Sequence, residues 1–298
     1  MAWRTIVISN PARLRLENDQ LKIMQEMEVT LPVDDINVLM IESQEVLITA
    51  ALLARLAEAG VLVLICDRKH LPCFAGLPYA NHSRLTGIHR MQLDMSVSLK
   101  RRFWQVIVTQ KIKNQARCIE LCGKTGYEAL YNLAKEVDSG DAGNIEAYAA
   151  REYFKCLFGN GFYRQETNHI NSALNYGYAI LRGSIARALA QYGFILTQGL
   201  HHHSELNAFN LADDFIEPLR PLCDLKVCSM SFEDGFTAKH RHELVSLLTC
   251  DLVIDGLKQS VRRTCEIMAS SFHTACREKN QKFLKMPMLM EIQEHRYE

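Results

Sequence analysis

The chain has 298 residues, of which 48% are hydrophobic, enough for one large domain or two ordinary ones with packed cores. The 34 basic and 34 acidic residues balance, so net charge gives no sign of a nucleic-acid partner. No apolar run approaches the ~18 residues that a membrane span needs, and no secretory leader is evident. Ten cysteines without a Cys-x-x-Cys pair argue against a zinc ribbon. We therefore expect a soluble, cytoplasmic protein with reduced thiols and no membrane partner.

The first 76 residues are predicted to be β-rich. Alternating apolar and polar residues surround Asn18 and Asp19, which is typical of a hairpin. A single helix is expected at about Val46–Ala59, ended by Gly60. Further strands are predicted at Trp3–Ser9, Met27–Leu31, Ile36–Ile41 and Val61–Cys66.

Residues 77–89 are rich in Pro, Gly, Asn and Ser, which predicts a linker. Helical periodicity dominates residues 90–298. The predicted fold class is therefore α+β, with a small β-rich N-terminal domain (1–76), the linker, and a larger all-α domain (90–298). Its helices are expected at Ser98–Cys118, Gly126–Asp138, Asn144–Phe158, Ile170–Tyr192, Leu206–Leu219, Lys239–Leu257 and Lys258–Lys279.

The segment Gly199–Pro221 combines three consecutive histidines with several carboxylates. Asp214 and Glu217 are three residues apart, so on a helix they project from one face. Two such acids repel each other unless a cation, an arginine or a proton neutralises them. The histidines His201–His203 could complete a cation site. The alternative is a solvated acidic helix end beside a polar loop.

A second acidic candidate is Glu146, in the first turn of the helix predicted at Asn144–Phe158, where the helix dipole favours a carboxylate. That position alone could explain the residue. However, its neighbours on the same face, Ala149 and Ala150, are small and would leave room for a hydrated metal or a phosphate.

Amides and basic residues provide a weaker signal for nucleic acid. Asn171 and Asn175 share one face of a predicted helix that also carries Tyr176 and Tyr178. Such amides could bridge helices, or could contact phosphates and bases. Clusters of Lys and Arg occur throughout the helical half, where each could be a solvated face or part of a phosphate-binding surface.

Together the hard ligands are Glu146, one of the three histidines, and Asp214 or Glu217. Carboxylates with a single imidazole suit Mg²⁺ or Mn²⁺ better than a thiol-seeking metal, although Zn²⁺ is chemically possible. Such a centre polarises a phosphodiester and lowers the pKa of an attacking hydroxyl. The residues thus favour metal-dependent phosphodiester chemistry on nucleic acid.

Three ordered motifs resemble the CRISPR-associated spacer-acquisition integrase, in the form found in type II systems. They are Asn-Ile-Glu-Ala-Tyr-Ala-Ala-Arg-Glu-Tyr-Phe (144–154), Ile-Asn-Ser-Ala-Leu-Asn-Tyr-Gly-Tyr-Ala-Ile-Leu (170–181), and Gly-Leu-x-His…Phe-Asn-Leu-Ala-x-Asp…Glu-Pro-Leu-Arg-Pro (199–221). The resemblance covers nearly the whole chain.

The resemblance implies a dimerising β-rich domain and a helical catalytic domain whose metal ligands are Glu146, His202 and Glu217. Asp214 would lie beside them, as a residue behind the ligands or as an alternative ligand. The run of three histidines departs from the family pattern and leaves the roles of His201 and His203 open. Within and around the motifs we expect DNA contacts from Arg151, Asn171, Asn175, Tyr176 and Arg220.

The implied reaction is transesterification, in which the 3′-hydroxyl ends of short DNA join the leader–repeat end of a CRISPR array. Implied partners are double-stranded DNA with 3′ overhangs, CRISPR repeat DNA, and a small dimeric adaptation protein that bridges two homodimers into a heterohexamer. The type II RNA-guided nuclease and an accessory adaptation protein are further implied partners. Two other classes stay open: a non-catalytic DNA-binding scaffold, and a metallo-oxygenase or hydrolase of small molecules using two histidines and one carboxylate.

Overall fold

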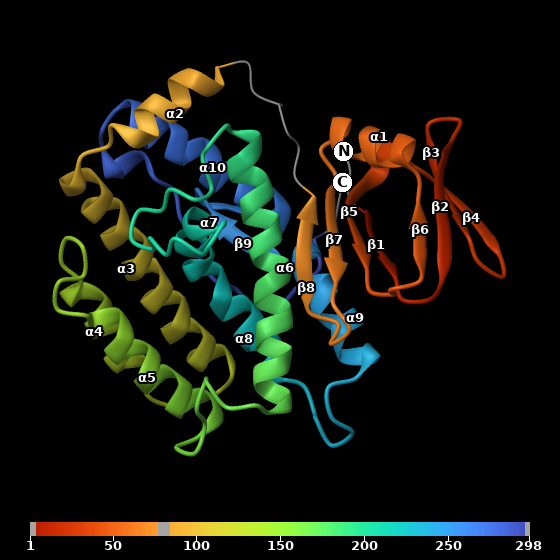
Figure 1. Cartoon of the computed structure of the whole chain (residues 1–298). Helices are drawn as coiled ribbons and strands as arrows, with labels where there is room; N and C mark the ends of the chain where they lie inside the picture. The colour runs from red at the N-terminus through yellow and green to blue at the C-terminus, as the bar shows by residue number, and fades with distance from the viewer. Residues whose placement is uncertain (1–3, 77–83, 296–298) are drawn as a thin grey trace. The chain divides into compact units, whose positions relative to one another are not determined.

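The computed structural model describes residues 4–76 and 84–295, and the chain divides into two compact units, Met1–Ser83 and Arg84–Glu298 (Figure 1). The division lies inside the predicted linker 77–89, whose residues 77–83 fall outside the described part. The rest of that range leads into a helix, α2 (Leu85–Leu93), rather than continuing as a loop.

The first unit contains a mainly parallel sheet with the strand order β1-β5-β7-β8. All six residues of β5 are buried, which explains why all but Asn37 are apolar. β1, β5 and β7 are parallel, while β8, which the sequence analysis missed, is antiparallel to β7. The strands are β1 (Arg4–Ile8), β5 (Ile36–Ile41), β7 (Leu62–Cys66) and β8 (Pro72–Gly76).

A second sheet in this unit has the order β4-β3-β2-β6, with β2 (Ala12–Glu17), β3 (Gln20–Met24), β4 (Glu28–Pro32) and β6 (Val46–Ile48). Asn18 and Asp19 have positive φ, as a two-residue hairpin turn between twisted strands requires. The helix predicted at Val46–Ala59 starts later, as α1 (Ala50–Glu58), because residues 46–48 pair with β2 and Thr49 caps the helix.

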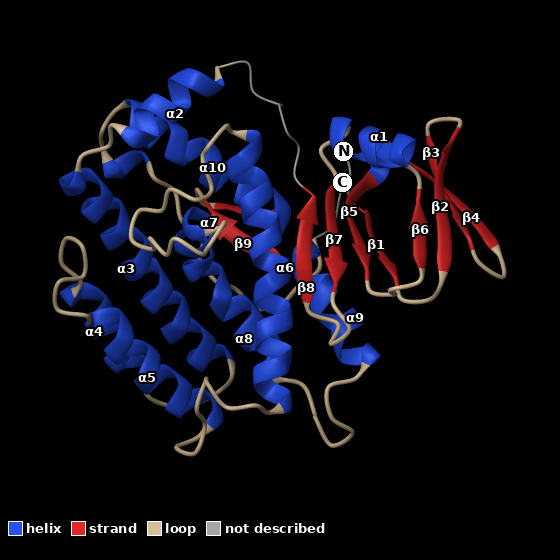
Figure 2. Ribbon diagram, viewed as in Figure 1, coloured by secondary structure: helices blue, strands red, loops and turns tan. Residues whose placement is uncertain are grey.

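The second unit is mainly helical (Figure 2). Its core is built from aromatic side chains: Phe272 contacts Phe103, Phe194 and Phe215 with ring centroids 5.5, 4.6 and 4.8 Å away. Besides α2, the helices are α3 (Val97–Leu121), α4 (Tyr127–Glu136), α5 (Ile145–Phe158), α6 (His169–Gln191), α7 (Asn210–Ile216), α8 (Arg220–Cys228), α9 (Ala238–Val245) and α10 (Val261–Arg277).

The segment from α7 to α8 packs against both of the long helices α3 and α6 (Figure 1). A 3₁₀ turn, Glu217–Leu219, joins α7 directly to α8. Gly177 lets α6 and α8 approach closely, because a Cβ there would lie 2.3 Å from the sulfur of Cys223. Helix α3 also packs against α5. It therefore contacts both α5 and the 3₁₀ turn.

The predicted fold class is confirmed, but the helix expected at Lys239–Leu257 is wrong beyond Val245. A 3₁₀ turn, Ser246–Thr249, is followed by a hairpin of β9 (Asp251–Ile254) and β10 (Leu257–Ser260). The Asp255-Gly256 turn has positive φ at both residues, which is the Asp-Gly signature of a hairpin. Among the described residues, no helix is long and apolar enough to cross a bilayer.

Candidate metal centre

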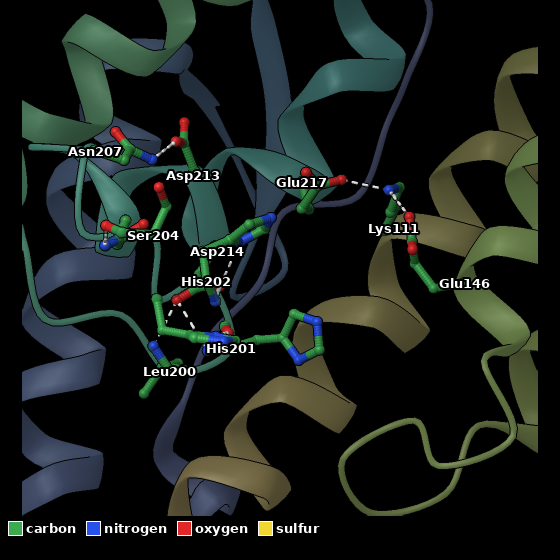
Figure 3. A network of polar contacts seen from close by, with 12 residues as sticks. Lys111, Glu146, Leu200, His201, His202, Ser204, Asn207, Asp213, Asp214 and Glu217 are labelled. Atoms are coloured by element: carbon green, nitrogen blue, oxygen red, sulfur yellow. Dashed lines mark hydrogen bonds and ion pairs between the residues drawn. The ribbon is translucent and has the colours of Figure 1, made fainter.

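The residues predicted to bind metal come from three separate elements of the helical unit (Figure 3). Glu146 lies in the first turn of α5, His202 in the loop that precedes α7, and Glu217 in the 3₁₀ turn after α7. Asp141 caps α5, accepting hydrogen bonds from the backbone amides of Ile145 and Glu146 at 2.9 and 3.0 Å. This cap fixes the backbone from which Glu146 projects.

Glu146 and Glu217 meet at one cation, the ammonium group of Lys111 on α3. The Lys111 Nζ contacts Oε1 of Glu146 and Oε2 of Glu217. The side chains of Lys111 and Glu217 are 9% and 6% exposed, whereas that of Glu146 is 27% exposed. Arg220 pairs with the other oxygen of Glu217, Oε1, at 3.0 Å. Two carboxylates from distant parts of the chain are thus drawn together by a shared positive charge.

These contacts decide the protonation states of the cluster. Burial by itself would raise the pKa of Glu217, but the positive charges of Arg220 and Lys111 outweigh it and hold the pKa below its usual range. Burial likewise opposes charge on Lys111, yet Glu217 and Glu146 raise the pKa of its ammonium above the ordinary value. At neutral pH the cluster therefore contains a charged carboxylate and a charged ammonium.

His202 is held by the fully buried Asp214. Its Nδ1 lies 2.7 Å from Oδ1 of Asp214, and its backbone amide donates to the same oxygen at 3.1 Å. The amides of Leu200 and His201 donate to Oδ2 at 2.5 and 3.3 Å. Asp214 is thereby occupied with shaping the loop, and in the neutral ring Nδ1 carries the proton while Nε2 keeps its lone pair.

The hydrogen bond that the His202 ring donates to Asp214 raises the pKa of His202 against the opposing effect of burial. The side chain of His202 is 39% exposed, so its outer edge is accessible. Close packing fixes this loop at Gly199: a Cβ there would lie 2.2 Å from the carbonyl oxygen of His202 and 2.8 Å from Oδ2 of Asp214. Only glycine fits this position without moving the loop.

The other two histidines are engaged elsewhere. His201 stacks on Trp104, with ring centroids 4.3 Å apart and planes 3° from parallel. His203 places Nδ1 2.8 Å from the carbonyl oxygen of His201. A site with two histidine ligands and one carboxylate, as the small-molecule oxygenase or hydrolase alternative requires, has no support from this arrangement.

The donor set suits a hard divalent cation, because two carboxylates converge on a positive charge and the imidazole has a free nitrogen. As they lie, however, no three acidic, histidine or cysteine side chains in residues 4–76 and 84–295 are close enough to enclose an ion. The Lys111 ammonium is the group that the two glutamates share. The chemistry of Glu146, Glu217 and His202 therefore fits such a metal. In this structure the Lys111 ammonium lies between the carboxylates of the two glutamates.

A cavity of about 730 Å³ opens beside His202. Lys100 and Arg101 of α3 line it together with the Trp104–His201 pair. Its walls offer positive charge and aromatic faces, which are the groups that bind phosphates and bases.

The residues predicted to contact DNA have different environments. Asn171 is buried, accepts a hydrogen bond from Arg164 and donates to the carbonyl groups of residues 163 and 166; Tyr176 is buried against Phe236. Both side chains are thus packed inside the helical unit, and their contact with DNA stays a prediction that this structure does not test. Asn175 is exposed but accepts a 2.6 Å hydrogen bond from Arg164. Arg151 is 63% exposed, and Arg220 lies over the ring of Tyr178 while it binds Glu217.

Sequence reasoning missed Lys111 as part of the site and counted it among the basic clusters. A signal was present: Lys111 is four residues after Ile107, three after Val108 and followed by Ile112, so it falls on the apolar stripe of α3. A lysine on such a stripe is buried, and a buried lysine needs acidic partners.

The described fold is thus a two-unit α+β protein whose helical unit carries a carboxylate–histidine cluster beside a basic cavity. Residues 5–263 match the family described as CRISPR associated protein Cas1. A curated relative, the CRISPR-associated endonuclease Cas1 of Neisseria meningitidis serogroup C (strain 8013), is 45% identical over 305 residues, covering 100% of both chains.

Solved structures share the fold at low identity. A casposase bound to integration product has a TM-score of 0.77 at 16% identity and covers 93% of this chain and 92% of that one. A Cas1 protein from Thermotoga maritima has a TM-score of 0.72 at 15% identity, covering 92% and 97%. The family match and the relative with 45% identity show that the chain belongs to the Cas1 family. The resemblance drawn from its sequence motifs is thereby confirmed.

Proposed function

We propose that this chain is the DNA integrase and endonuclease of CRISPR adaptation, which joins the 3′-hydroxyl ends of short DNA to a CRISPR repeat by transesterification. The observation that carries the proposal is the convergence of Glu146 and Glu217 on one cation, in a site whose histidine, His202, is held through Nδ1 by Asp214. Membership of the Cas1 family and the 45% identity to a Cas1 endonuclease support it.

In this proposal Glu146, His202 and Glu217 hold Mg²⁺ or Mn²⁺. With the ion bound, the site gains an electrophile that stabilises negative charge on the phosphodiester oxygens and lowers the pKa of the attacking hydroxyl. Asp214 keeps the His202 ring in the tautomer that leaves Nε2 free. Arg220 orients Glu217, and Lys100 and Arg101 attract the DNA backbone to the adjacent cavity.

The proposed partners are duplex DNA with 3′ overhangs, CRISPR repeat DNA, a second copy of this chain that pairs through the strand-rich unit, and a small dimeric adaptation protein. Two solved structures of similar fold support a DNA partner and a Cas2 partner: a casposase bound to integration product, and a Cas6-RT-Cas1–Cas2 complex (TM-score 0.74, 16% identity, 97% of this chain and 36% of that one). We further propose a cytoplasmic location, which the ten free cysteines support.

A non-catalytic DNA-binding scaffold is the second candidate, and one observation favours it. The Lys111 ammonium already pairs with both Glu146 and Glu217, as in a structural ion-pair cluster. A scaffold would bind DNA without needing a divalent cation and would not join strands.

A half-site integration assay separates the two candidates. Purified chain, with and without the small partner protein, is incubated with supercoiled CRISPR plasmid and labelled prespacer DNA in Mn²⁺, Mg²⁺ or EDTA. We expect metal-dependent joining that Glu146→Gln and Glu217→Gln each abolish. The matched control is Glu152→Gln, which alters an exposed carboxylate on the same α5 helix that pairs only with Arg151 and Lys155 among the contacts described. Full activity of Glu217→Gln would refute the proposal.

A further inference from the structure

We infer that Lys111 is a built-in cation that occupies the place between Glu146 and Glu217 and leaves it when a divalent cation binds there. The inference rests on the proposed function, because it concerns the same metal centre. The carboxylate oxygens that would hold the metal, Oε1 of Glu146 and Oε2 of Glu217, are the two atoms that Lys111 Nζ contacts (Figure 3). An ammonium and a divalent cation cannot share those oxygens, because ligand bonds of about 2.0–2.6 Å would bring the two positive centres into contact.

The backbone around the centre is fixed, so the side chain is the part that can move. Asn114, one turn along α3, donates hydrogen bonds to the carbonyl oxygen of Pro218 at 2.7 Å and to that of Pro287 at 2.9 Å. The first bond ties α3 to the turn that carries Glu217. The lysine side chain has four rotatable bonds, and Glu146, more than a quarter exposed, gives its ammonium a route toward solvent.

Charge balance explains why the lysine is there and when it leaves. Without metal, the two glutamates are matched by two cations, Lys111 and Arg220, and the Asp214 carboxylate behind His202 adds one negative charge. Removing the ammonium alone would leave the carboxylates repelling each other. A divalent cation adds two positive charges while the tethered ammonium stays nearby, which makes the centre positive even with the Asp214 carboxylate counted. A DNA phosphate supplies the balancing negative charge, so metal and DNA should each strengthen binding of the other.

The test measures Mn²⁺ affinity of the full chain by electron paramagnetic resonance of free Mn²⁺, with and without duplex DNA carrying 3′ overhangs. Lys111→Met removes the competing charge and keeps a long side chain. Lys135→Met is the control, because that exposed lysine on α4 contacts only the side chain of Asn132 among the bonds described. Glu217→Gln reports whether the binding occurs at this centre.

In the absence of DNA, we expect Lys111→Met to bind Mn²⁺ at least about fivefold more tightly than the wild type. This factor is at the low end of the range found for the coupling between two ligands. DNA should tighten Mn²⁺ binding more in the wild type than in the variant, and Lys135→Met should behave as the wild type. Equal or weaker binding by a folded Lys111→Met would overturn the inference. Absence of any Glu217-dependent binding in the wild type with DNA would instead overturn the proposed function.

Should Lys111→Met fail to fold, as judged by thermal unfolding, the wild type provides the second measurement. In crystals of the wild type grown with Mn²⁺, we expect Lys111 Nζ to lie beyond hydrogen-bonding distance of both glutamates. An ammonium still in contact with both while Mn²⁺ binds them would contradict the inference.

Discussion

The Nδ1 atom of His202 lies 2.7 Å from Oδ1 of Asp214, and this contact gives the two ring nitrogens different tasks. Nδ1 faces a buried carboxylate that also accepts hydrogen bonds from three successive backbone amides, those of residues 200–202. Nε2 takes no part in these contacts and, in our proposal, is the nitrogen that binds the metal. We therefore propose that Asp214 positions the histidine and is not itself a metal ligand.

Asp214→Asn tests this relationship. An amide keeps the shape but offers one acceptor in place of two, so either the loop amides or Nδ1 of His202 loses its partner. We expect Mn²⁺ affinity to fall about 10–100-fold, as for other residues that orient metal-binding histidines. Asp213→Asn is the control, because Asp213 binds Asn207 and Arg182 instead. The Mn²⁺ affinity of this variant should match that of the wild type.

The three histidines should separate by function. His202→Ala should abolish both Mn²⁺ binding and strand joining. His201→Ala loses the stack on Trp104, a contribution of about 0.5–1.5 kcal/mol, and an edge contact with the ring of His202, but should keep Mn²⁺ affinity. His203→Ala should also keep the Mn²⁺ affinity of the wild type. Loss of Mn²⁺ binding in His201→Ala would mean that a second histidine is a ligand, which would revive the small-molecule alternative.

Gly199→Ala should disrupt the site through its backbone. The added Cβ meets a carbonyl oxygen at 2.2 Å, so the loop carrying His202 has to move. We expect a loss of roughly 1–3 kcal/mol in the free energy of unfolding, and a larger loss of strand joining. Gly161→Ala is the control, because nothing lies within 4 Å of a Cβ at that position. Unchanged activity of Gly199→Ala would show that the loop is not held as described.

A pH-dependent stability is expected from Asp224, a buried carboxyl bonded by the hydroxyl groups of Tyr153 (2.8 Å) and Tyr178. Burial raises the pKa of Asp224 to about 6, against the lowering effect of the two tyrosines. The folded chain therefore binds this proton more tightly than the unfolded chain, and the free energy of unfolding falls as pH rises from about 4 to 6.

The comparison is with Asp224→Asn, which does not titrate. From pH 4 to pH 7 the wild type should lose about 2 kcal/mol more than the variant, because most of the effect of a shift of about two pKa units falls in that range. Chemical denaturation at several pH values measures the difference. A difference that does not change with pH would show that the carboxyl is not held in its protonated form.

Much of this fold follows from local sequence patterns. The buried run Ile36–Ile41 and the Asn18-Asp19 turn predicted their strand and hairpin, and the long amphipathic patterns predicted α3 and α6. The hairpin at residues 251–260 was missed, although Asp255-Gly256 is a turn signal, because the helical pattern before it was extended too far.

The site was predictable only as an inventory of residues. Spacing identified Asp214 and Glu217 as neighbours, and the family resemblance selected His202 from the three histidines. Spacing could not distinguish the roles of the two acids, because that depends on tertiary contacts: Asp214 turns back to the loop and Glu217 faces α3. The pairing of Lys111 with Glu146 likewise joins distant segments, and only the packing of α3 against α5 brings them together.

The central claim is that Glu146, His202 and Glu217 hold a single divalent cation. Anomalous diffraction from crystals of the DNA complex grown in Mn²⁺ measures this directly. The account predicts one strong peak within about 2.0–2.6 Å of a carboxylate oxygen of each glutamate and of Nε2 of His202. Ordered DNA with no peak there, or a peak bound by other residues, would contradict it.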